Sequence, residues 1–176
     1  MGSIVAPSAL GQGMKYRIAF VTDGVTDALH SDHQYYDSFV QAEADAHGLG
    51  KNPGPVTWLA LISSMDGTKA TNRLPIDNVP IYLLSADPVA TGRTSLWNGS
   101  LLHAIDQSPT TTGITGEVWT GTRAGGDVSY PLGSTGYHVE CAGFTIRLPD
   151  MFSYGFVTQP NVQKRLVAIS EVFAVG

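Results

Sequence analysis

The sequence predicts a single α+β domain with short strands, one early helix and long loops. Three observations lead to this prediction: strand-like apolar segments near both ends of the chain, one amphipathic helical pattern between them, and a middle rich in Gly, Ser and Thr. The 176 residues amount to one domain, and only 14% are charged, against about 25% in an average domain. The composition excludes a long helical bundle and is typical of loop-rich proteins on extracellular or virion surfaces.

Residues 1–14 are predicted to form an N-terminal arm, and residues 15–176 the folded domain. The arm has no charged side chain before Lys15 and consists of small, apolar or flexible residues. Arms of this kind are ordered only when something holds them. Packing on a neighbouring subunit and packing on the same domain both remain open.

The first strand and the helix have the clearest local signals. Residues 16–21 are predicted to form a strand with Tyr16, Ile18 and Phe20 on one face, followed by a loop at residues 22–29. The helix is predicted to begin with Ser31 as N-cap, because Gln34 follows three residues later. Gly48 and Gly50 are expected to end it. Its buried face is expected to contain residues at helical spacing: Tyr35, Phe39, Ala42 and Ala46.

The rest of the chain is predicted to form short strands within long loops. Strands are expected at residues 56–62, 80–84, 117–120 and 166–175, and long loops at residues 63–78 and 121–143. Both faces of the last strand are expected to be covered, since apolar residues occupy both alternating sets. A helical turn within residues 95–105 is expected to bury five side chains: Leu96, Trp97, Leu101, Leu102 and Ile105.

Charge and cysteine content exclude several classes of function. The net charge is −5, the pI is near 5.4 and the basic residues are scattered, so neither nucleic acid nor an anionic membrane surface is an expected partner. Cys141 is the only cysteine, which excludes a disulfide within the chain. Residues 1–13 lack the pattern of a signal peptide, and the apolar run at 166–175 is too short to span a bilayer. No membrane insertion is expected.

The densest group of potential metal ligands is the His30, Asp32 and His33 segment, with Asp23 and Asp27 close by in the sequence. Imidazole and carboxylate groups suit Zn²⁺ or a similar ion. The same residue types at the start of a helix also serve as caps and interact favourably with the helix dipole. The sequence therefore assigns no metal ligand and no cofactor.

No combination of residues predicts catalysis. His138 and Cys141 are close in the sequence, but no third residue that would orient the imidazole is identifiable, and a packed thiol is the simpler role. Residues 21–26 contain the Asp-Gly pair of haloacid-dehalogenase phosphatases, yet Val21 stands where that chemistry needs a nucleophilic aspartate. We therefore expect a protein that is not an enzyme, with no catalytic residue.

Three triplets contain oxygen ligands suited to Ca²⁺: Leu-Pro-Asp at 148–150, Gln-Pro-Asn at 159–161 and Trp-Asn-Gly at 97–99. They resemble the calcium-binding triplets of sugar-binding C-type lectins. Gly99 stands where those lectins have Asp, and this triplet precedes the other two, so we interpret all three as turns. All three tryptophans are expected in the core, although one on a loop would offer a platform for a sugar: Trp58, Trp97 and Trp119.

Seven segments occur in a distinctive order: YRIAFVTD at 16–23, the helix at 36–46, TWLALI at 57–62, VPIYLL at 79–84, LWNGSL at 96–101, VWTGT at 118–122 and LVAISEV at 166–172. Together they resemble exported bacterial proteins that carry PEP-CTERM sorting tails, and more distantly the endostatin-like branch of the C-type-lectin-like fold. The resemblance implies that the first and last strands lie together and that long loops form a variable surface. The sequence departs from the family because it shows no PEP-CTERM motif, so anchoring is not implied.

These observations predict a non-catalytic surface or extracellular protein of a bacterium. Its expected ligand is a glycan or a protein, bound through the loops at residues 63–78 and 121–143. The alternative is a self-assembling structural subunit of a phage virion, filament or surface layer, which docks through residues 1–14. A homo-oligomer or surface assembly is the expected state, and the virion is the alternative location. Backbone pairing of an exchanged arm would supply much of the affinity in such an assembly.

Overall fold

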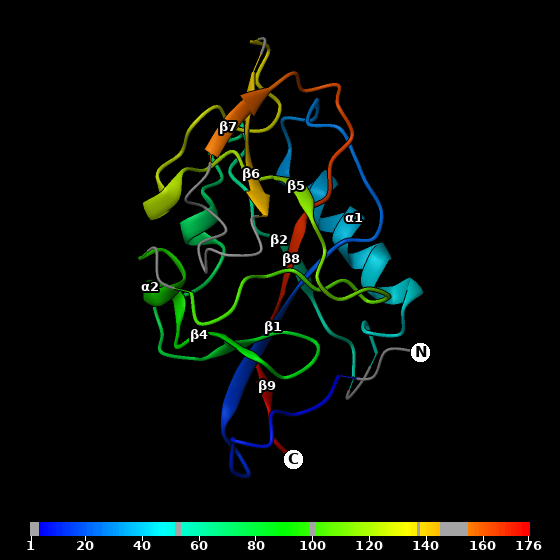
Figure 1. Ribbon diagram of the computed structural model, residues 1–176, viewed down its shortest axis with the longest axis vertical. Coiled ribbons are helices and arrows are strands. Elements are labelled where there is room, and N and C mark those ends of the chain that lie inside the picture. The colour runs from blue at the N-terminus through cyan, green and yellow to red at the C-terminus, as the bar shows by residue number, and fades with distance from the viewer. Residues whose placement is uncertain (1–3, 52–53, 99–100, 137, 145–154) are drawn as a thin grey trace.

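The computed structural model describes residues 4–51, 54–98, 101–136, 138–144 and 155–176 (Figure 1). Its elements follow in the order β1 (Lys15–Val21), α1 (His33–Ala46), β2 (Trp58–Ala60), β3 (Ile81–Tyr82), β4 (Pro88–Ala90), α2 (Arg93–Leu96), β5 (Gly116–Trp119), β6 (Val139–Phe144), β7 (Gly155–Thr158), β8 (Val167–Ser170) and β9 (Phe173–Ala174). Short 3-10 turns occur at Ala70–Asn72 and Ala124–Gly126. Short strands, helices and long loops are the predicted α+β organisation.

Two sheets organise the described residues. The larger sheet has the strand order β2-β8-β1-β3-β4, with β9 also paired to β1, and the smaller has the order β5-β6-β7. Figure 1 shows the smaller sheet at one end of the molecule and β9 with the C-terminus at the other. The Trp119 N–H donates to the Arg165 carbonyl at 3.0 Å, which joins β5 to the segment entering β8.

The first and last strands of the described chain pair with each other. β1 runs antiparallel to both β8 and β9 and parallel to β3. The predicted strand at 166–175 is therefore two strands along one edge of β1. At the break between them, the Ser170 hydroxyl accepts a hydrogen bond from the Ile18 N–H at 2.9 Å and donates to the Glu171 carbonyl at 2.7 Å. This side chain takes the place of a ladder partner where the chain leaves the sheet.

Both faces of β1 are buried, which explains its unbroken apolar character. The predicted set Tyr16, Ile18 and Phe20 packs into one core cluster under α1, together with Trp58. The second cluster covers the opposite face of the larger sheet and includes Leu96, Trp97, Leu101 and Ile105. Their predicted burial is confirmed, but the helix within the predicted turn ends at Leu96, and Leu102 is 57% exposed, so its predicted burial is wrong.

Helix α1 begins one residue later than predicted. Asp32, in extended conformation, is the N-cap, and its side chain accepts a hydrogen bond from the Gln34 N–H at 2.9 Å. Ser31 instead contributes its carbonyl, which accepts from the Asp66 N–H at 3.1 Å. The predicted cap was wrong by one residue, because Asp32 has the extended N-cap conformation and its carboxylate supplies the side-chain acceptor. At the other end, Gly48 adopts a positive φ of 75° just beyond the helix, as the sequence indicates.

The buried face of α1 also differs from the prediction. Tyr36, Val40 and Ala44 are fully buried, whereas Ala42 and Ala46 are exposed. Tyr35 is 38% exposed and stacks on His30 with ring centroids 3.6 Å apart. Apolar residues lie on two sides of this helix, and only the side with Tyr36, Val40 and Ala44 packs on the sheet.

Three strands were not predicted. β4 pairs with β3, and β6 and β7 complete the smaller sheet. β6 begins at Val139, so the end of the predicted loop at 121–143 is a strand. The Gly and Ala residues of β6 hide its strand character in the sequence, since neither has a strong β preference.

Described residues of the N-terminal segment pack on their own domain. Pro7 is buried, and Ile4 and Leu10 pack against the core cluster under α1. The Gly13 N–H donates to the Val175 carbonyl at 2.8 Å. Among the described residues, the helices are too short or too polar to cross a bilayer.

Candidate functional site

The two loops that the sequence singles out, residues 63–78 and 121–143, lie against each other. Ser64 forms an isolated parallel bridge with Leu132. The Met65 N–H donates to the Leu132 carbonyl at 2.9 Å. We refer to these two segments together as the paired loops.

Two glycines of the second loop allow close backbone approach, one to the first loop and one to the segment before α1. Gly121 has a φ of 59°, and a Cβ atom there would lie 2.3 Å from the Ser63 carbonyl oxygen. Gly133 has a φ of 82°, and its Cβ would lie 2.2 Å from the Ser31 Cα. Any larger residue at either position would push the backbones apart.

Asp66 anchors the first of the paired loops to the start of α1. Its carboxylate accepts hydrogen bonds from the His33 N–H at 2.9 Å, the Ser64 hydroxyl at 2.7 Å and the Thr68 N–H at 3.0 Å. The His33 ring lies 2.6 Å away through Nδ1. Burial by itself raises the pKa of Asp66, but these hydrogen bonds outweigh it and hold the pKa well below its usual range.

Two further ion pairs hold the same loop. Asp77 makes a bidentate pair with Arg17 of β1 at 2.8 and 2.9 Å, and the Arg17 side chain is only 2% exposed. The hydrogen bonds from Arg17 lower the pKa of Asp77. Arg73 pairs with Asp37 of α1 and also donates to the Ala60 carbonyl at 3.1 Å. The loop at 63–78 is therefore fixed to the scaffold at three points.

The paired loops expose apolar side chains on this rigid base. Met65 is 52% exposed, Val128 41% and Tyr130 50%. Tyr130 also has a positive φ of 42°, which is uncommon for an aromatic residue. We refer to these three side chains as the paired-loop surface.

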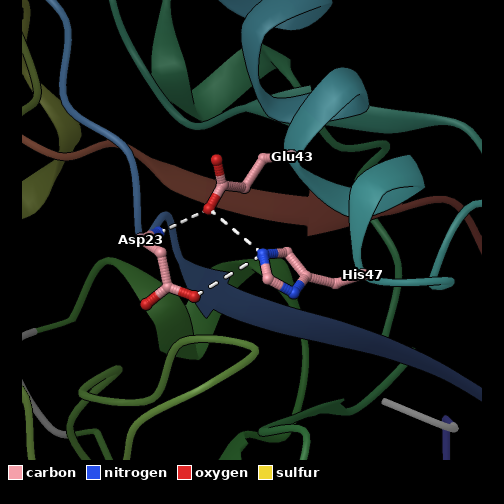
Figure 2. Close-up of side chains that lie close together, drawn as sticks. All are labelled: Asp23, Glu43 and His47. Carbon is pink, nitrogen blue, oxygen red and sulfur yellow. Dashed lines mark hydrogen bonds and ion pairs between the residues drawn. The ribbon is translucent and has the colours of Figure 1, made fainter. Parts of the chain in front are cut away.

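A second group of polar side chains gathers where β1 ends (Figure 2). Asp23 follows β1, Glu43 lies in the last turns of α1, and His47 caps that helix. The His47 Nε2 atom lies 3.7 Å from Asp23 Oδ2 and 3.8 Å from Glu43 Oε1. The three side chains are between 15% and 29% exposed. We refer to them as the Asp23 cluster.

The neighbours of the Asp23 cluster hold its carboxylates in place. Glu43 Oε1 accepts the backbone N–H groups of Asp23 at 2.7 Å and Gly24 at 3.2 Å. The Thr110 hydroxyl donates to Asp23 Oδ2 at 2.8 Å. Arg165 lies 3.8 Å from Asp23 Oδ1 and donates to the Asp23 carbonyl at 3.0 Å. The cluster thus joins α1, the end of β1, the 110 loop and the start of β8.

The structure separates the potential metal ligands that lie close together in the sequence. Asp23 joins Glu43 and His47, whereas Asp32 and His33 lie beside Asp66. Spacing along the sequence misses these partners, since Glu43 and Asp66 lie 20 and 33 residues from the groups they meet. The other two candidates have local roles, because Asp27 Oδ1 accepts from the Leu29 N–H and the His30 ring stacks on Tyr35.

Cys141 is fully buried on β6, opposite Trp119 of β5. Burial, with a smaller contribution from Glu140, raises the pKa of the Cys141 thiol to about 12. Such a thiol is protonated near neutral pH and is a poor nucleophile. His138 is exposed, and Glu140 accepts a hydrogen bond from the Ser129 hydroxyl at 2.9 Å.

The remaining candidate binding residues from the sequence are the three tryptophans and the three triplets with oxygen ligands. Trp58, Trp97 and Trp119 are at most 9% exposed, so the expected core positions are confirmed. At 159–161, the Val162 N–H donates to the Gln159 carbonyl in a turn. The triplet at 148–150 lies outside the described residues, as does Gly99 of the third.

Comparison with known proteins adds no relative. No protein-family model matches the chain, and no curated protein matches it either.

Proposed function

We propose that the chain is a non-catalytic binding domain of a bacterial cell surface, with a C-type-lectin-like fold. One observation carries the proposal. The paired loops lie together on a base held by three ion pairs or charged hydrogen-bond networks and expose Met65, Val128 and Tyr130. Binding residues commonly lie on loops that a rigid scaffold positions.

The fold part of the proposal rests on topology. β1 pairs with β8 and β9, which is the closure of first and last strands that the resemblance implies. Long connections between short strands fill the middle of the chain, and the paired loops belong to them. An extracellular or cell-surface location follows from the same resemblance and from the low charge content of 14%.

A glycan is the ligand class that this surface favours. An exposed Tyr ring offers an apolar face on which a pyranose stacks while its rim remains hydrogen-bonded. Fixed loops lose little conformational entropy on binding, which favours affinity for a small ligand.

The test is a glycan array probed with the labelled full chain. We expect a glycan that binds the natural chain and binds at least tenfold more weakly to Tyr130→Ala and to Met65→Ser. Val172→Ser is the matched control, because Val172 is 38% exposed beside β9, away from the paired loops. If the natural chain binds no glycan on the array, or if all variants bind equally, the proposal is contradicted. If the paired-loop surface instead binds a protein, the binding role is supported and the glycan is rejected as the ligand.

A further inference from the structure

We propose that the Asp23 cluster binds one Zn²⁺ ion per chain. Asp23, Glu43 and His47 offer two carboxylates and one imidazole, and their ligand atoms all lie within 4.8 Å of one another. Both groups are ordinary zinc ligands, and sites with three protein ligands leave a fourth position for water. The proposal is independent of the paired-loop surface.

The separations within the cluster fit an ion better than direct contact. His47 Nε2 lies 3.7 Å and 3.8 Å from the two carboxylate oxygens, which is too long for a hydrogen bond. Two ligands at about 2.1 Å from a tetrahedral zinc lie roughly 3.4 Å apart. A shift of a few tenths of an ångström would bring the imidazole into range of an ion held between the carboxylates.

The carboxylates are already oriented for such an ion. Glu43 Oε1 is held by the N–H groups of Asp23 and Gly24, and Asp23 Oδ2 by the Thr110 hydroxyl. A carboxylate has about four lone-pair sites, so Glu43 Oε2 and a second lone pair of Asp23 Oδ2 remain for a metal. Donors around the ligands fix their geometry and raise metal affinity.

Charge and access also favour a cation. The two carboxylates (−2) outweigh the one cation beside them, Arg165 (+1), so the cluster attracts a cation. Thr110, which touches Asp23, also lines a pocket of about 270 Å³ with Ser85, Gln107 and Ser108. This pocket offers room for water beside the site.

The second group of ligand-type residues is the natural control. In the Asp32, His33 and Asp66 group, His33 Nδ1 lies only 2.6 Å from the Asp66 carboxylate and next to the Thr68 hydroxyl at 3.0 Å. An ion there would have to displace hydrogen bonds that already satisfy the imidazole. We therefore expect zinc affinity to depend on His47 and not on His33.

The test is calorimetric titration of the full, untagged chain with zinc chloride. We expect one ion per chain for the natural protein and for His33→Gln, and at least tenfold weaker binding for His47→Gln. Co²⁺ in place of zinc is expected to give the visible absorption of tetrahedral cobalt, which His47→Gln removes. If His47→Gln does not fold, Asp23→Asn is tested with the same expectation. A natural chain that binds no zinc, or a His47→Gln chain with full affinity, would overturn the proposal.

Discussion

Asp66 shows how much one carboxylate contributes to the paired loops. It accepts hydrogen bonds from the N–H groups of His33 and Thr68 and from the Ser64 hydroxyl. Asp66→Asn replaces one charged acceptor oxygen by a donor that cannot satisfy these groups. We expect a loss of about 1–3 kcal/mol in the free energy of unfolding, measured by urea denaturation. Asp127→Asn, at an exposed loop position, is expected to change it by less than about 0.5 kcal/mol.

The same residue predicts a pH dependence. The pKa of Asp66 is lower in the folded state than its ordinary value of 3.8, so folding favours its charged form. Its stabilising contribution is therefore fully present above that value and is lost as the pH falls through the folded-state pKa. Urea denaturation of the natural chain and Asp66→Asn should give a difference in free energy that is constant above about pH 5 and narrows progressively as the pH falls from about 5 to 2. A constant difference across this range would contradict the assignment.

The Arg17–Asp77 pair places a charge inside the protein. Arg17 is 2% exposed, so Asp77→Ala leaves a buried guanidinium without its carboxylate. We expect this variant to lose about 3–5 kcal/mol of unfolding free energy in urea denaturation. Adding Arg17→Met removes the stranded charge and should recover part of the loss. A double variant no more stable than Asp77→Ala would show that the cost does not come from the unpaired charge.

At the scale of elements, helix α1 offers a direct test of which face packs on the sheet. Ala44 is fully buried and Ala46, two residues later, is exposed. Ala44→Leu adds three carbon atoms to a filled core, and we expect a loss of about 1–3 kcal/mol by thermal or urea unfolding. Ala46→Leu should change stability by less than about 0.5 kcal/mol. A larger loss for Ala46→Leu than for Ala44→Leu would instead support the buried face that the sequence predicts.

At the scale of the whole molecule, the N-terminal segment bears on the state of association. Ile4 and Leu10 pack against the core of the same chain, and Gly13 is bonded to Val175. In place of the homo-oligomer that the sequence predicts, we therefore expect light scattering on a sizing column to give a monomer near 18.7 kDa. A mass of many subunits that falls to one on deletion of residues 1–12 would instead favour the structural subunit with a docking arm.

Local patterns in the sequence predict several elements well. Strand β1, the extent of α1 to within a residue or two, and the core positions of the three tryptophans follow from alternation, helical spacing and apolar context. These signals are local, because alternation and helical spacing are set by residues within a few positions of one another. The short strands β4, β6 and β7 escape because Gly, Ala and Pro hide their periodicity.

What the sequence determines by itself is therefore the α+β class, the main strands and the one long helix. The tertiary structure decides which face of α1 is buried, that Asp32 and not Ser31 caps it, and which carboxylates meet which cations. Asp66 reaches His33 across 33 residues and Asp77 reaches Arg17 across 60. Such pairings depend on sheet order and on backbones that approach closely at Gly121 and Gly133. Sequence spacing does not predict these contacts, because the paired side chains become neighbours only when the strands have paired in the folded sheet.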